Sequence, residues 1–149
     1  MTLKRQLFIL VWGVLLFVAC GGQPTVSEPT EVQMSDLERV AGLLVGFEVE
    51  ERPLSIPPEA IQAKAGIYFV TADEQVDILI FELESGGDFS NAVSKLAAEG
   101  IDIAAETPLS FAGANGAVLF VVRNVAAPEQ QEDARWVVSE ISGALAGEE

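Results

Sequence analysis

The sequence predicts an α+β domain over residues 34–149. It has a four-stranded antiparallel sheet made of two hairpins, each followed by an amphipathic helix, and one further helix before them. Stretches with apolar residues three and four positions apart alternate with short runs rich in Val, Ile and Phe. Turn-forming residues join these runs in pairs, at Ala72–Gln75 and at Gly113–Gly116. The length suits one domain, because it is large enough for a single hydrophobic core.

The first helix is predicted to begin at Ser35, because Ser35 and Glu38 form a capping box. Gly46 ends it. Residues 47–50 alternate between apolar and acidic and predict a short edge strand. Pro57–Lys64 predicts a short helical turn, with Gly66 at its end. The apolar stripe of the first helix consists of Leu37, Val40, Ala41, Leu44 and Val45.

The first hairpin is predicted from the strands Ile67–Thr71 and Val76–Glu84. Asp88 then caps a second helix that ends at Gly100. One face of this helix carries Phe89, Val93, Leu96 and Ala97.

The second hairpin joins Leu109–Ala112 to Ala117–Val125. Asn115 and Gly116 predict the turn, because both residues tolerate a positive φ. Pro128 opens the last helix. Its inner face is predicted to carry Ala134, Val137, Val138, Ile141 and Leu145.

The two longest strands are apolar on both faces, whereas a sheet with one wet face alternates between apolar and polar residues. We expect the helices that follow the two hairpins to pack on one face, so something must cover the second face. The candidates are the Ser35 helix, a second copy of the chain, or another protein, and we favour the helix. The residues concerned are Ile78 and Ile80 against Leu79, Phe81 and Leu83, and Val118, Phe120 and Val122 against Leu119 and Val121.

The chain starts with Lys4 and Arg5, continues with the apolar stretch Leu7–Ala19, and reaches Cys20, its single cysteine. A membrane-spanning helix needs about 20 apolar residues, so this shorter stretch has the dimensions of a signal peptide. The pattern resembles the processing signal of bacterial lipoproteins. Phe17 departs from it, because that family usually has Leu at this position.

The resemblance implies that residues 1–19 are removed as a signal peptide and that Cys20 is lipidated. The acyl chains would anchor the protein in the cell membrane or the outer membrane, facing outside the cytoplasm. Residues 20–33 predict a flexible acidic linker. An ordinary secretory peptide or an uncleaved anchor is the alternative.

The charge balance is strongly acidic, with a formal net charge of −15. Loss of Lys4 and Arg5 from the 8 Lys and Arg leaves six against 23 Asp and Glu, which is a charge of about −17. Such a surface repels phosphate backbones, so nucleic acid is excluded as a partner. The predicted partners are the membrane, through the lipid anchor, and another envelope protein or a second copy of the chain.

Few groups are available for catalysis. The chain has no histidine, which excludes Ser-His-Asp and Cys-His catalysis. Ser94 and Lys95 are neighbours on a helix, so their side chains point about 100° apart. We therefore predict no catalytic residue and no cofactor.

Acidic residues are the remaining candidates for a metal site. Asp73, Glu74 and Asp77 surround the first hairpin turn, and their oxygens are of the kind that binds Ca²⁺. Their spacing does not match an EF-hand loop. Solvated turn carboxylates are the simpler interpretation.

Trp136 lies beside the apolar stripe of the last helix, next to Arg135. A tryptophan in such a place is typical of the rim of a core. Contact with a partner is the alternative, because Trp and Arg are enriched at binding hot spots.

These observations predict a membrane-anchored, non-enzymatic binding or accessory module. The alternatives are a protein that binds divalent cations or small solutes through the acidic turns, and a carboxylate-dependent hydrolase.

Overall fold

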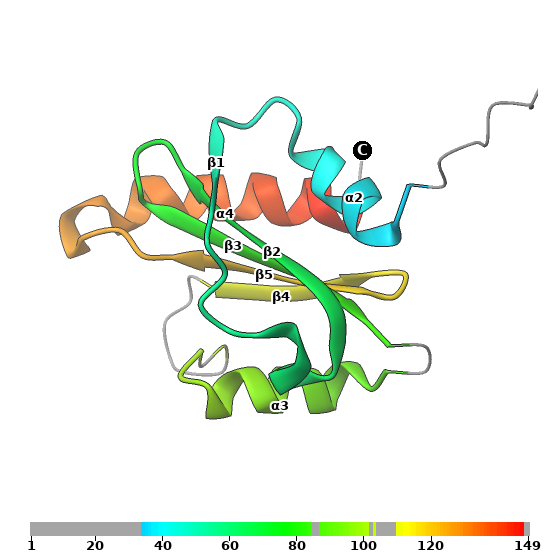
Figure 1. Cartoon of the computed structure of the whole chain (residues 1–149). Helices are drawn as coiled ribbons and strands as arrows, with labels where there is room; N and C mark the ends of the chain where they lie inside the picture. Colours follow the sequence, from blue (N-terminus) through cyan, green and yellow to red (C-terminus); the bar gives the residue numbers. More distant parts are fainter. Residues whose placement is uncertain (1–33, 85–86, 102, 104–109, 148–149) are drawn as a thin grey trace, which may run out of the picture. The chain divides into compact units, whose positions relative to one another are not determined.

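The computed structural model describes residues 34–84, 87–101, 103 and 110–147. Within them the chain forms three α-helices, three short 3₁₀ helices and five strands (Figure 1). In chain order these are α2 (Asp36–Ala41), η1 (Gly42–Leu44), β1 (Val49–Arg52), η2 (Pro58–Ile61), β2 (Ala63–Thr71), β3 (Val76–Leu83), α3 (Phe89–Ala98), β4 (Ser110–Asn115), β5 (Val118–Asn124), η3 (Pro128–Gln130) and α4 (Gln131–Ala146).

The strands form one antiparallel sheet in the order β1-β2-β3-β5-β4. The two predicted hairpins are confirmed as β2–β3 and β4–β5, and β3 pairs with β5 at the centre. The sheet has five strands where the sequence predicted four. The fifth is β1, which pairs with β2 from Val49 opposite Thr71 to Arg52 opposite Tyr68. The sequence indicated a short strand here, but its alternating pattern did not say which strand it would join.

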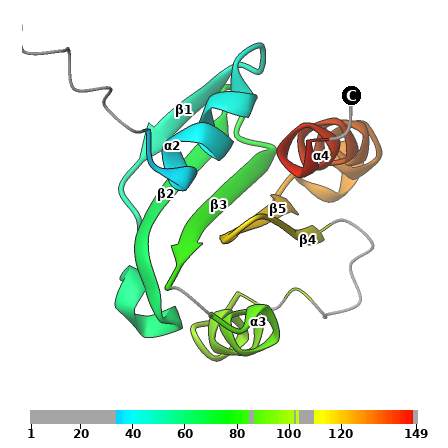
Figure 2. The same cartoon turned by 90° about the vertical axis from the view of Figure 1, so that its right-hand side faces the viewer.

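Helices cover both faces of the sheet (Figures 1 and 2). Helices α2 and α4 pack against one face, and α3 with η2 packs against the other. The expectation that the helices after both hairpins share one face, with the Ser35 helix on the other, is therefore wrong: α2 lies on the same face as α4, and α3 lies on the opposite face. The cover of both faces nevertheless comes from the chain itself. Strands β3 and β4 run parallel with β5 between them, so α3 has to cross the sheet to connect them. That crossing places α3 on the second face.

Each face has its own hydrophobic core, and the alternation along β3 separates them. Ile78 and Ile80 pack under α2 and α4, whereas Leu79 and Phe81 pack under α3. All four side chains are fully buried. Full burial of such a side chain contributes about 1.5 to 3 kcal/mol, so the two faces together supply most of the driving force for folding.

The local signals for helix ends are largely confirmed. Ser35 and Glu38 form the predicted capping box, and Asp88 caps α3 by accepting from the backbone N–H groups of Ser90 and Asn91. The helix predicted from Ser35 to Gly46 ends earlier, because α2 gives way to η1 at Gly42.

Several element boundaries differ from the prediction. The turn predicted over Pro57–Lys64 ends at Ile61, and β2 already begins at Ala63. Gly66 was expected to end that turn, but it lies inside β2 beneath the ring of Phe81. Strand β4 runs as far as Asn115, so the second hairpin closes through a turn of two residues, 116 and 117.

Candidate functional site

A polar cluster lies on the α3 side of the sheet, where β2, β3 and β5 run side by side. Asp77 and Arg123 face each other across β3 and β5. The Arg123 Nε–H donates to Asp77 Oδ1 over 2.7 Å, and Arg123 Nη2 donates to Oδ2. Tyr68 Oη lies 3.5 Å from Asp77 Oδ2. Asp77 is 3% exposed, so the cluster holds a buried carboxylate whose two oxygens are both occupied.

The cluster shifts the pKa values of the two groups around Asp77. Burial raises the pKa of Tyr68 above its usual value, and the negative charge of Asp77 adds to this effect. The hydrogen bonds to Asp77 raise the pKa of Arg123, so this guanidinium stays charged. A carboxylate held by two guanidinium N–H groups is poorly placed to take a proton from a substrate. We therefore interpret the cluster as a structural ion pair.

Tyr68 is the single tyrosine of the chain, so its ionisation can be followed directly by phenolate absorbance. We expect a midpoint above pH 10, because the folded state favours the neutral phenol. This contribution to stability is present below pH 10 and is lost as the pH rises through the raised folded-state pKa. The Tyr68→Phe variant has no phenol to ionise, so its stability should fall less than that of the unchanged chain as the pH rises above 10. A midpoint at or below 10 would contradict the burial of this side chain.

The three candidate metal ligands do not converge. Asp73 Oδ1 accepts from Thr71 Oγ1 over 2.6 Å and from a backbone N–H in the same turn over 3.2 Å. The Glu74 carboxylate lies 3.6 Å from Arg52 Nη2, and Asp77 is held by Arg123. Among the described residues, no group of three or more His, Cys, Asp or Glu side chains is placed to hold a metal ion.

Trp136 is one of the large apolar side chains that the described surface exposes, at 71%. This exposure contradicts its interpretation as the rim of a core. The buried residues of α4 include Ala134, Val138 and Leu145. At 100° per residue, Trp136 points roughly away from all three of them. It therefore occupies the outer face of α4.

Acidic side chains surround Trp136 on that outer face. Glu132, Asp133 and Glu140 lie four and three residues before it and four residues after it, which makes them its neighbours on the helix surface. All three are exposed. None of the ion pairs formed within residues 34–84, 87–101, 103 and 110–147 involves them. Glu132 and Asp133 lie in the first turn of α4, where their negative charges stabilise the helix by interacting with its dipole.

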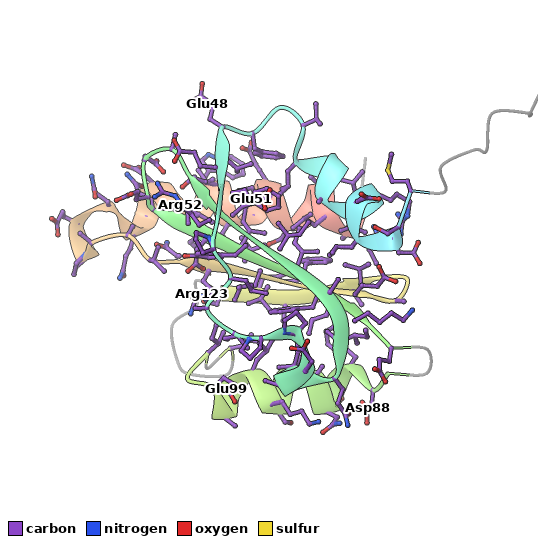
Figure 3. The ribbon with its side chains drawn as sticks, in the orientation of Figure 1. Glu48, Glu51, Arg52, Asp88, Glu99 and Arg123 are labelled. Atoms are coloured by element: carbon purple, nitrogen blue, oxygen red, sulfur yellow. The ribbon has the colours of Figure 1, made fainter. Side chains whose placement is uncertain are left out.

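A pocket of about 430 Å³ opens beside α4. Its lining includes Val137, the residue that follows Trp136. Glu48, which lies in this lining, points away from the body of the domain where β1 begins (Figure 3). Sequence reasoning missed the pocket, because its residues come from three separate segments and form no local motif. The lining consists of Phe47, Glu48, Thr71, Ala72, Asp73 and Val137.

Cys20, the predicted lipidation site, lies outside the described residues. Among the helices that the structure describes, none is both long and apolar enough to cross a membrane.

Comparison with protein-family models, with curated proteins and with solved structures finds no match for this chain.

Proposed function

We propose that the chain is a lipid-anchored protein outside the cytoplasm and that its domain is a non-enzymatic binding module. The observation that carries the proposal is the 71% exposure of Trp136 on the outer face of α4. An exposed indole gains little for folding, whereas a tryptophan buried on association is among the strongest contributors to binding. The outer face of α4 around Trp136 is the proposed docking surface.

The partner is a positively charged segment of another envelope protein. Glu132, Asp133 and Glu140 surround the indole, and the chain as a whole has a net charge of −15. Arginine suits this surface, because its guanidinium can stack on an indole while its N–H groups bind carboxylates. The same carboxylates repel anionic headgroups, so charge complementarity favours a basic protein segment over a lipid surface.

The pocket is lined by Val137, the residue that follows Trp136 on α4. Phe47, Ala72 and Val137 give it an apolar lining, and Asp73 contributes a carboxylate. An arginine or lysine side chain has the matching form, with an apolar stem and a cationic end. A segment that crosses α4 at Trp136 would therefore find a second place for a basic side chain.

The proposed lipid anchor is supported by the N-terminal sequence. Lys4, Arg5, the stretch Leu7–Ala19 and Cys20 support signal peptide removal and lipidation. The mass of the protein recovered from membranes tests this part. We expect a chain that begins at Cys20 and carries two or three acyl groups, and we expect Cys20→Ser to lose them.

The docking surface can be tested with a short synthetic peptide of arginine and leucine, in comparison with the same peptide carrying uncharged citrulline in place of arginine. Trp12 lies in the leader that we expect to be removed, so Trp136 is the single tryptophan of the processed chain and its fluorescence reports binding. We expect the arginine peptide to bind, and salt to weaken this binding. The Trp136→Ala variant lacks this fluorescence, so its binding is measured with a labelled peptide. We expect its affinity for the arginine peptide to be at least tenfold lower.

The control is Glu99→Gln, at the C-terminal end of α3 on the other side of the sheet (Figure 3). It removes one negative charge, as Glu140→Gln does, but from a distant surface. Glu140→Gln should weaken binding more than Glu99→Gln. Equal effects of the two variants would show that the peptide responds only to the overall charge of the protein. Either this result or equal binding of the two peptides would contradict a site for arginine at Trp136. Binding of anionic vesicles in place of the peptide would contradict the protein partner.

A further inference from the structure

The two edges of the sheet differ in the way they face solvent. Strand β1 has the sequence Val-Glu-Glu-Arg, and such charges keep an edge from pairing with other chains. Strand β4, at the opposite edge, has the sequence Ser-Phe-Ala-Gly-Ala-Asn, with no charge and no proline. Each of its residues is exposed or partly exposed. The β4 edge therefore lacks the features that protect the β1 edge.

The register of the β4–β5 hairpin determines which backbone groups of β4 point away from β5. The two-residue turn after Asn115 makes Asn115 and Val118 a hydrogen-bonded pair. Such pairs alternate along an antiparallel ladder, so the backbone groups of Ser110, Ala112 and Ala114 point away from β5. Among the described residues, these three N–H groups and three C=O groups have no partner strand, and they form the edge of the sheet.

We propose that a second copy of the chain pairs with this edge. The two β4 strands would run antiparallel about a twofold axis at Ala112, so that one sheet continues across both copies. In this register Ala112 faces Ala112 of the second copy, and Ser110 faces its Ala114. All outward groups of both strands are then paired, which is the self-complementarity that a twofold interface requires.

The side chains of β4 suit the same register. Phe111 is 45% exposed and would lie opposite Gly113 of the second copy. Because β4 has no charged residue, the pairing brings no like charges into direct contact in a chain with a net charge of −15. This surface is separate from the proposed docking surface on α4.

Cysteine crosslinking tests the register in the full chain, solubilised in detergent with Cys20→Ser so that the introduced thiol is the single one. Ala112→Cys should form a disulfide-linked dimer under mild oxidation. Paired residues in an antiparallel ladder have Cα atoms about 5.5 Å apart, within the roughly 4.4 to 6.8 Å that a disulfide spans.

Ser110→Cys is the matched control, on the same strand and the same face. In the proposed register it lies four residues away from its own counterpart, about 13 Å, so it should not crosslink by itself. A mixture of Ser110→Cys and Ala114→Cys chains should crosslink, because these positions face each other. Absence of crosslinking at Ala112, or equal crosslinking of Ser110→Cys alone, would overturn the proposal.

Ala112→Pro provides a second measurement. The Ala112 N–H points away from β5, so proline removes an outward donor and leaves the ladder inside the domain complete. In the Cys20→Ser chain without an added cysteine, we expect the dimer seen by sedimentation to dissociate while the circular dichroism stays unchanged. A well-folded Ala112→Pro chain that remains dimeric would overturn the proposal. Trp136→Ala should leave the dimer intact, which separates this result from the docking test.

Discussion

Replacing Arg123 by alanine should reduce the free energy of unfolding by about 3 to 5 kcal/mol, the usual cost of removing one partner of a buried ion pair. Asp77 is 3% exposed, and both of its carboxylate oxygens accept from Arg123. Without Arg123 the carboxylate would remain in the sheet with only the long hydrogen bond from Tyr68 Oη, at 3.5 Å, among its side-chain contacts described above. Urea unfolding of the variant and the unchanged chain measures the difference.

Arg52→Ala is the matched control. Arg52 lies toward the same end of the sheet as Arg123 (Figure 3). Its ion pair with Glu50 has a short distance of 2.8 Å but is exposed on both sides, so we expect a loss of about 0 to 1 kcal/mol. Equal losses for the two variants would show that Asp77 is better solvated than its burial indicates.

A double replacement separates the charge from the packing. Asp77→Leu with Arg123→Leu removes both charges and keeps apolar side chains opposite each other on β3 and β5. Replacing a buried pair in this way is often neutral or stabilising. We therefore expect the double variant to be clearly more stable than Arg123→Ala. A double variant as unstable as Arg123→Ala would place the cost in packing and not in the unpaired charge.

The second large effect is expected at the two glycines that lie under phenylalanine rings. A Cβ on Gly66 would lie 2.6 Å from Cδ1 of Phe81, and a Cβ on Gly113 would lie 2.5 Å from Cζ of Phe120. Both rings are fully buried, so neither can move away freely. Gly66→Ala and Gly113→Ala should each cost about 1 to 3 kcal/mol, the usual range for overpacking a core.

Gly143→Ala in α4 is the control for these two substitutions. Apart from the adjacent residues and the nearby backbone of α4 itself, no atom lies within 4 Å of the position of its Cβ, and alanine is the better helix former. We expect this variant to be unchanged or more stable by up to about 1 kcal/mol. Thermal unfolding of the three variants gives the comparison. A Gly66→Ala chain as stable as Gly143→Ala would contradict the close packing of Phe81 on β2.

Local signals predicted much of the fold. The capping box at Ser35, the cap at Asp88 and the two hairpins depend on neighbouring residues, and all are confirmed. The side of the sheet that each helix covers depends on the course of the whole chain. For that reason α3 and α4 were expected on one face, whereas they cover opposite faces. Gly66 misled for a similar reason, because a glycine that ends a turn and one that lies under a ring look alike in sequence.

The site was harder to predict than the fold. Asp77 was grouped with Asp73 and Glu74 because the three are close in the chain, but strand alternation directs Asp77 toward Arg123, 46 residues away. The pairing becomes visible only once the register of β3 and β5 is known. Trp136 was identified from its residue type, but its outward direction depends on which face of α4 is buried.

The most direct test of the proposed function is photocrosslinking from the outer face of α4 in intact cells. A photoreactive amino acid at Ser139, an exposed position about one helical turn from Trp136, keeps the indole in place. Ser94, exposed on α3 on the other side of the sheet, is the matched control position. The segment that becomes attached is identified by mass spectrometry.

We predict that Ser139 crosslinks to one other envelope protein, at a segment rich in lysine and arginine, and that Trp136→Ala abolishes this product. The same product should be missing from the Ser94 position. Crosslinks from Ser139 to lipid alone, to an acidic or uncharged segment, or to a product that persists in Trp136→Ala would contradict the account of α4 as a docking surface for a basic partner.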